Sequence, residues 1–145
     1  MKKLLKFIMY AILGFFALII VIAIFSDTSE HEKPAEKSSA TFRQVDSEVG
    51  CSSKYSEDKK EDIFKNAYKN KLFTWEGIVS KSDNGRVQIK IKPTTIVSDI
   101  DIRLKNKKDG YELQENMIVK FNFIMESAGG CFLPYTGKNA ELVRN

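Results

Sequence analysis

Histidine is nearly absent from this chain of 145 residues, which contains only one. That residue, His31, lies in a polar stretch near the N-terminus, so the sequence from residue 41 onward has none. Serine–histidine catalysis, cysteine–histidine catalysis and imidazole metal sites are therefore excluded for that part. The sequence also lacks a glycine motif that cradles phosphates. We accordingly expect no enzyme, no cofactor and no metal site.

Cysteine is scarce as well, with two residues, Cys51 and Cys131. Neither belongs to a CxxC motif, and no histidine follows residue 41 to share a metal with them. In an oxidising compartment such a pair predicts one disulfide. A reactive thiol pair or a metal-binding pair is the functional alternative.

Acidic residues are missing from residues 1–26, which contain Lys2, Lys3 and Lys6. Three of the 23 basic residues thus lie there, and the rest of the chain carries 20 basic and 19 acidic residues, a net charge of +1. The basic character of the whole sequence therefore does not by itself indicate nucleic-acid binding.

One long apolar run, FIMYAILGFFALIIVIAIF, occupies residues 7–25 without a charge. As a helix it would span about 28 Å, close to the hydrocarbon core of a bilayer. We predict a transmembrane signal-anchor over residues 1–26. A cleaved signal peptide is the competing interpretation, but the run is longer than usual and ends without a small-x-small site. The preceding lysines predict that the N-terminus is in the cytoplasm and the C-terminal domain is outside it. The Met-Lys-Lys start and the export-compatible cysteines favour a bacterial inner membrane.

A polar, charged stretch, DTSEHEKPAEKSSA, follows at residues 27–40. It has too few apolar residues to bury a core. We predict a flexible linker over residues 27–45 and an extracytoplasmic domain over residues 46–145.

Period-two alternation dominates the domain after a helix expected at about residues 56–70. Asn84-Gly85 favours a tight hairpin, and Gly77 suggests a bulge. Strands are expected at about residues 72–81, 86–92, 99–104, 117–125 and 131–143. The fold class is mostly β: one α-helix followed by a five-stranded, OB-like antiparallel barrel.

Three segments then resemble a known family. They are FKNAYKNK at residues 64–71, WEGIV at 75–79 and LQENMIVKF at 113–121, where Asn116 replaces the usual glycine. This pattern, covering about residues 60–143, resembles the bacterial tRNA_anti-like, periplasmic OB-fold proteins. The resemblance implies an OB fold, a framework that binds oligonucleotides, oligosaccharides or proteins.

The candidate binding residues are Lys90, Lys92 and Arg103 on the outward faces of the second and third strands, with Tyr135 beyond them. Asp99 and Asp101 share the outward face, which is mixed in charge and lacks aromatic rings, so nucleic acid is not the expected ligand. We expect a membrane-anchored binding module for an envelope protein or glycan. The alternatives are a mobile-element envelope protein that blocks phage or plasmid entry, an accessory subunit of a membrane complex, and a single-strand nucleic-acid binder.

Overall fold

The computed structural model describes residues 34–92 and 94–143. Within those ranges no helix has the length and apolar character needed to cross a bilayer. The transmembrane segment predicted at residues 7–25 lies outside the described residues, as do residues 27–33 of the predicted linker.

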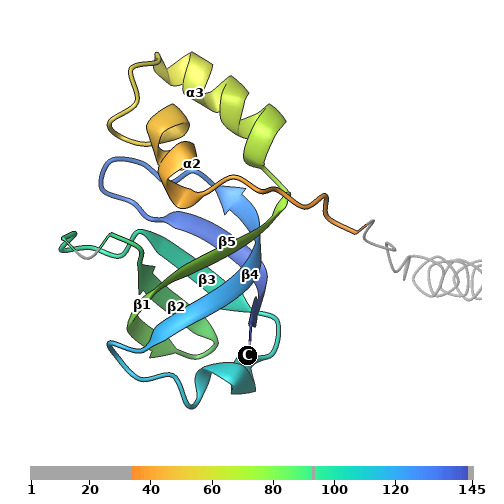
Figure 1. The fold of residues 1–145 in the computed structure, drawn as a ribbon, viewed down its shortest axis with the longest axis vertical. Coiled ribbons are helices and arrows are strands. Elements are labelled where there is room, and N and C mark those ends of the chain that lie inside the picture. The colour runs from red at the N-terminus through yellow and green to blue at the C-terminus, as the bar shows by residue number, and fades with distance from the viewer. Residues whose placement is uncertain (1–33, 93, 144–145) are drawn as a thin grey trace, which may run out of the picture. The chain divides into compact units, whose positions relative to one another are not determined.

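Two helical regions precede five strands (Figure 1). The elements in order are α2 (Phe42–Val49), α3 (Glu57–Ile63), the π-helical turn η1 (Phe64–Tyr68), β1 (Leu72–Asp83), β2 (Arg86–Lys90), β3 (Ile100–Leu104), the 3-10 turn η2 (Lys107–Gly110), β4 (Ile118–Ser127) and β5 (Tyr135–Leu142). Figure 1 shows α2 and α3 together at one end of the strands.

The strands close into a barrel in the order β1-β2-β3-β5-β4. This mostly β, five-stranded architecture is consistent with an OB-like barrel. One expectation was wrong, because the sheet is not wholly antiparallel: β3 and β5 run parallel, with Ile100 opposite Tyr135. The connection between these two strands is long enough for a parallel pairing because it contains η2 and the whole of β4.

The core follows the predicted alternation on β2, β3 and β4. Its buried members on these strands are Val87, Ile89, Ile100, Ile102, Leu104, Val119, Phe121, Phe123 and Met125. The hairpin at Asn84-Gly85 is confirmed, since both residues have positive φ angles, 48° and 78°. Asn116 also adopts the left-handed conformation, with a φ of 72°.

One local prediction on the barrel was wrong and another was incomplete. Gly77 forms no bulge, because the register between β1 and β2 shifts between Val79 and Lys81 instead. A Cβ on Gly77 would lie 2.5 Å from Ile89 Cγ2, so glycine here permits close packing of the strands. Asp101 keeps its predicted place on the outer face, opposite Gln88, but it is buried, and the exposed Arg86 guanidinium pairs with its carboxylate at 2.8 Å.

The helix expected at residues 56–70 is confirmed as α3 continued by η1. Ser56 caps it by accepting a hydrogen bond from the Lys59 amide at 3.4 Å. Phe64 and Tyr68 bury their rings, and the Tyr68 hydroxyl donates to a Glu48 carboxylate oxygen at 2.7 Å. The helical region is thereby attached to α2.

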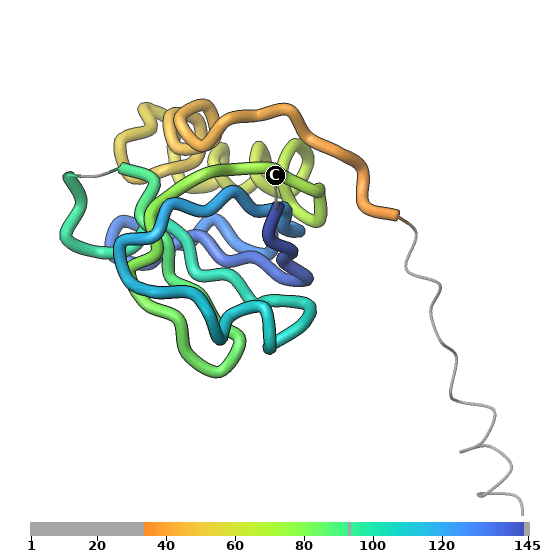
Figure 2. The backbone as a smooth tube through the Cα atoms, turned by 60° about the horizontal axis from the view of Figure 1, so that its bottom comes forward, coloured from red at the N-terminus to blue at the C-terminus, as the bar shows by residue number. Residues whose placement is uncertain are grey.

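The flexible linker predicted up to residue 45 was wrong for its described part. Residues 34–41 run over the start of β1 (Figure 2), where Lys37 forms a parallel bridge with Leu72. Phe42 and Val45 belong to α2 and are buried. The polar composition did not indicate this arrangement, because a few apolar residues are enough to stabilise a short helix when they pack against a barrel.

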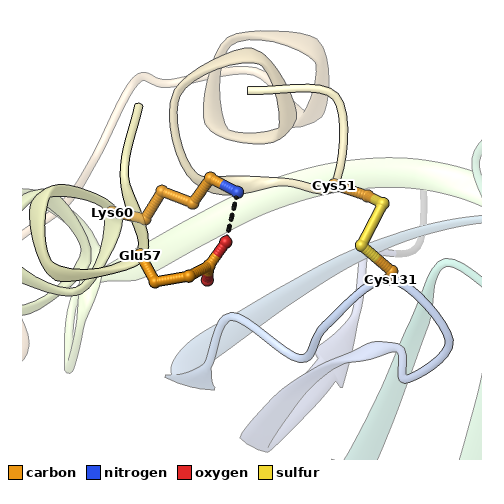
Figure 3. Close-up of a disulfide and its surroundings, with 4 residues drawn as sticks. All are labelled: Cys51, Glu57, Lys60 and Cys131. Atoms are coloured by element: carbon orange, nitrogen blue, oxygen red, sulfur yellow. Dashed lines mark hydrogen bonds and ion pairs between the residues drawn. A yellow bond between two sulfur atoms is a disulfide. The ribbon is translucent and has the colours of Figure 1, made fainter. Parts of the chain in front are cut away.

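The predicted disulfide between Cys51 and Cys131 is present (Figure 3). It joins the loop after α2 to the loop between β4 and β5, across 80 residues of sequence. The α2 region is therefore held to the barrel by a covalent bond as well as by packing.

Candidate binding groove

The four predicted binding residues do not form one surface. Arg103 lies opposite Arg86 at the start of β2, whereas Lys90 ends that strand four residues later, about 13 Å away. Lys92 lies beyond the end of β2, and Tyr135 is buried, with 5% of its surface exposed.

Two of the predicted cations are already neutralised within the domain. Lys92 Nζ lies 2.5 Å from an Asp46 carboxylate oxygen on α2. The Arg103 guanidinium donates to both carboxylate oxygens of Glu126 on β4, at 2.7 Å each. A carboxylate therefore balances each of these two cations, which weakens the basic face predicted from sequence.

The geometry instead forms an apolar groove of about 580 Å³ on the side of the barrel. Residues 39–43 form one wall, residues 74–76 of β1 line it, and Ile91 and Lys92 complete it. Only Lys92 among the predicted binding residues borders this groove.

A hydrogen bond and an aromatic contact fix the wall of the groove. The Trp75 indole N–H donates to the Ala40 carbonyl oxygen at 3.0 Å. The Phe42 ring then meets Trp75 edge to face, with centroids 5.3 Å apart. Thr41 caps α2 by accepting from the Gln44 amide at 3.2 Å, which sets the direction of the helix.

Lys92 connects the groove to α2 in a second way. Its ammonium group lies 5.2 Å from the centroid of the Phe42 ring, within the range of a cation–π interaction. The same ammonium pairs with Asp46. Lys92 therefore holds the groove wall in place, which sequence analysis could not reveal because Asp46 lies 46 residues away.

Sequence analysis missed the aromatic lining of the groove. Trp75 and Phe42 are core residues by burial, at 5% and 7% exposed, yet both border the groove. Core-like spacing concealed their second role. A detectable signal was the apolar spacing of Phe42, Val45 and Val49, which is helical.

Exposed apolar side chains also gather on two loops beside a smaller hollow of about 150 Å³. Val97 comes from the β2–β3 loop and is 61% exposed, and Phe132 and Leu133 come from the β4–β5 loop at 92% and 70%. Neither loop was predicted to be apolar at its tip.

Burial governs the titration of two tyrosines near α2. It raises the pKa of Tyr68, and the hydrogen bond to Glu48 raises it further. Burial also raises the pKa of Tyr135, with a further contribution from the negative charge of Asp46. Both pKa values lie above the ordinary value of 10.

We predict that the domain loses stability in strong alkali. Because folding raises both tyrosine pKa values, their contribution is fully present below pH 10 and declines as the pH rises toward the folded values. Absorbance titration near 295 nm should show two phenols that ionise only above pH 10, together with a falling free energy of unfolding. Tyr68→Phe and Tyr135→Phe should each remove one late transition, and ionisation of both at pH 10 would contradict the prediction.

Comparisons of this chain with family models, with curated proteins and with solved structures find no match. The resemblance to tRNA_anti-like proteins therefore stays a prediction. The fold and the groove are the observations on which a functional proposal can be based.

Proposed function

We propose that the chain is a membrane-anchored extracytoplasmic module that binds an envelope protein. The observation that carries the proposal is the apolar groove with Trp75 and Phe42 on its lining. Apolar pockets lined by aromatic side chains are typical of recognition sites. The predicted anchor at residues 7–25 supports the location, and the Cys51–Cys131 disulfide favours an oxidising compartment.

A protein is favoured over a glycan or a nucleic acid by the chemistry of the groove. Its lining is mainly apolar, and the cations among its lining residues are Arg43 and Lys92, of which Lys92 is paired with Asp46. A glycan carries many hydroxyl groups, whose hydrogen bonds a mainly apolar lining cannot replace, and single-stranded nucleic acids need a basic groove. The two disfavoured classes become outcomes of the test.

The proposal is tested by cross-linking the C-terminally tagged full chain in native membranes and identifying captured proteins by mass spectrometry. Ser39 is exposed and lines the groove, so Ser39→Trp should fill it and abolish specific capture. Ser52→Trp is the matched control, because Ser52 is exposed and lies outside the groove. We expect one envelope protein with the wild type and with Ser52→Trp.

Charge reversal separates this groove from the face predicted by sequence. The double variant Lys90→Glu with Arg103→Glu should retain capture, because neither residue borders the groove. Loss of capture in that variant, with capture kept in Ser39→Trp, would transfer the site to the outer face of β2 and β3. No specific protein in any capture would overturn protein binding, and glycan and nucleic-acid arrays would then follow.

A further inference from the structure

The first half of β1 has a strand neighbour on only one side. β1 pairs with β4 from Leu72 to Ile78. Its pairing with β2 begins only at Ile78, which lies opposite Lys90. β2 therefore pairs only with the second half of β1. The first half of β1 pairs with β4 on one side, and its opposite side takes no part in the pairing with β2.

At the end of β2, the backbone is hydrogen-bonded to the Asp99 side chain and not to β1. The amides of Ile91 and Lys92 donate to one carboxylate oxygen of Asp99, at 2.7 and 2.8 Å. These amides therefore do not continue the ladder to β1. The separation of the two segments is fixed by charged hydrogen bonds.

The direction of the main-chain groups along the first half of β1 follows from the hydrogen bonds of Leu72, at its start, and of Val79, just beyond it. The main-chain N–H and C=O groups of Val79 point to the β4 side. Its amide donates to the Met117 carbonyl and its carbonyl accepts from the Asn116 amide, both at 2.8 Å. The main-chain groups of Leu72 point to the opposite side, because its amide donates to the Glu36 carbonyl at 2.9 Å.

Main-chain groups alternate in direction along a strand. The N–H and C=O groups of Thr74 and Glu76 therefore point to the same side as those of Leu72, away from β4. The register from Leu72 to Ile78 is continuous, so no bulge reverses this order. Among residues 34–92 and 94–143, no main-chain partner lies on that side of Thr74 or Glu76. Both residues line the groove.

The structure also shows that this edge accepts an extended chain. Two residues before Thr74, the Leu72 carbonyl accepts a hydrogen bond from the Ser38 amide at 2.8 Å, which completes the parallel bridge between Lys37 and Leu72. Residues 36–38 thus pair with one residue of this edge, Leu72, and the chain then continues into α2. The next two outward-facing residues, Thr74 and Glu76, remain available.

We propose that the groove binds an extended peptide segment of the partner protein, which adds as a short strand to the open edge of β1 at Thr74 and Glu76. This inference rests on the proposed function and specifies how the partner is recognised. Two amides and two carbonyls, spaced about 7 Å apart along the strand, complement the main chain of an extended peptide.

Alternate side chains of the peptide would face the groove, where Trp75, Phe42 and Ile91 are located. Main-chain hydrogen bonds would supply affinity, and the apolar lining would select the side chains. The expected ligand is therefore a segment with apolar residues at every second position, free of proline where its amides face β1.

A proline substitution on β1 tests the edge directly. Glu76→Pro removes the outward amide while leaving the ladder to β4 intact, because the Glu76 amide does not face β4. Glu76→Ala keeps the amide and is the matched control. We expect the two variants to have similar melting temperatures, with peptide affinity at least about tenfold weaker in Glu76→Pro.

The probe is a displayed library of random short peptides, selected on the full chain in lipid nanodiscs. Selected peptides should alternate apolar and polar residues. Resynthesis with N-methyl groups on one alternating set of amides should abolish binding, while methylation of the other set should preserve it. This second measurement remains decisive if Glu76→Pro fails to fold.

An absence of selected peptides, equal binding by Glu76→Pro and Glu76→Ala, or equal effects of the two methylation patterns would overturn strand addition. These failures are distinct from failure of the proposed function. Capture in membranes that is sensitive to Ser39→Trp but unchanged by Glu76→Pro would preserve the binding module and reject only its strand-addition mode.

Discussion

Replacing both cysteines with serine is expected to lower the free energy of unfolding by about 4–5 kcal/mol. The disulfide closes a loop across 80 residues, and in the chain-entropy model a loop of that length removes much of the freedom of the unfolded chain. A domain of this size has a total stability of about 5–15 kcal/mol. The variant should therefore unfold far more readily in denaturant.

The measurement is denaturant unfolding of the wild type and the Cys51→Ser, Cys131→Ser double variant. Adding a reductant that opens the disulfide should shift the wild type toward the variant and leave the variant unchanged, which separates cross-linking from nonspecific effects of the reductant. A difference below about 1 kcal/mol would contradict a structural role for the disulfide.

The second large effect concerns the segment predicted to be a linker. Phe42→Ala is expected to cost about 3–5 kcal/mol of unfolding free energy, the range for a buried phenylalanine. The phenyl ring contacts Trp75 and Tyr135, with centroids at 5.3 and 5.7 Å, so its removal leaves a cavity between them. Arg43→Ala is the matched control, because Arg43 is exposed and should change stability by less than about 0.5 kcal/mol.

A truncation extends the same prediction. A fragment beginning at residue 46 lacks Phe42 and Val45 and the carbonyl of Ala40 that accepts from Trp75. It should be less stable than a fragment beginning at residue 34 by more than the cost of Phe42→Ala alone. Equal stability of the two fragments, measured by denaturant unfolding, would restore the predicted linker boundary.

The strands were predictable because alternation is a local property. Phe121, Phe123 and Met125 are buried at every second position of β4, and the pattern can be recognised without tertiary information. The parallel placement of β5 beside β3 depends on the closure of the whole barrel. Local spacing does not contain that information.

The charged surface was less predictable than the core. Lys92 and Arg103 were recognisable as exposed cations, but their partners, Asp46 and Glu126, are distant in sequence. A solvated face and a neutralised face look alike in sequence. The groove was hidden for a related reason, since its edge consists of main-chain groups that every residue shares.

Mechanical load would reach this domain along a defined path. Tension applied through Pro34 would first strain the hydrogen bonds between residues 36–38 and Leu72, and then the bond from Trp75 to Ala40. Unravelling from that end would stop at Cys51, because the cross-link to Cys131 ties the next residues to the barrel. The disulfide therefore limits how much of the domain a pull on its N-terminal side can extend, and passes the load to the loop between β4 and β5.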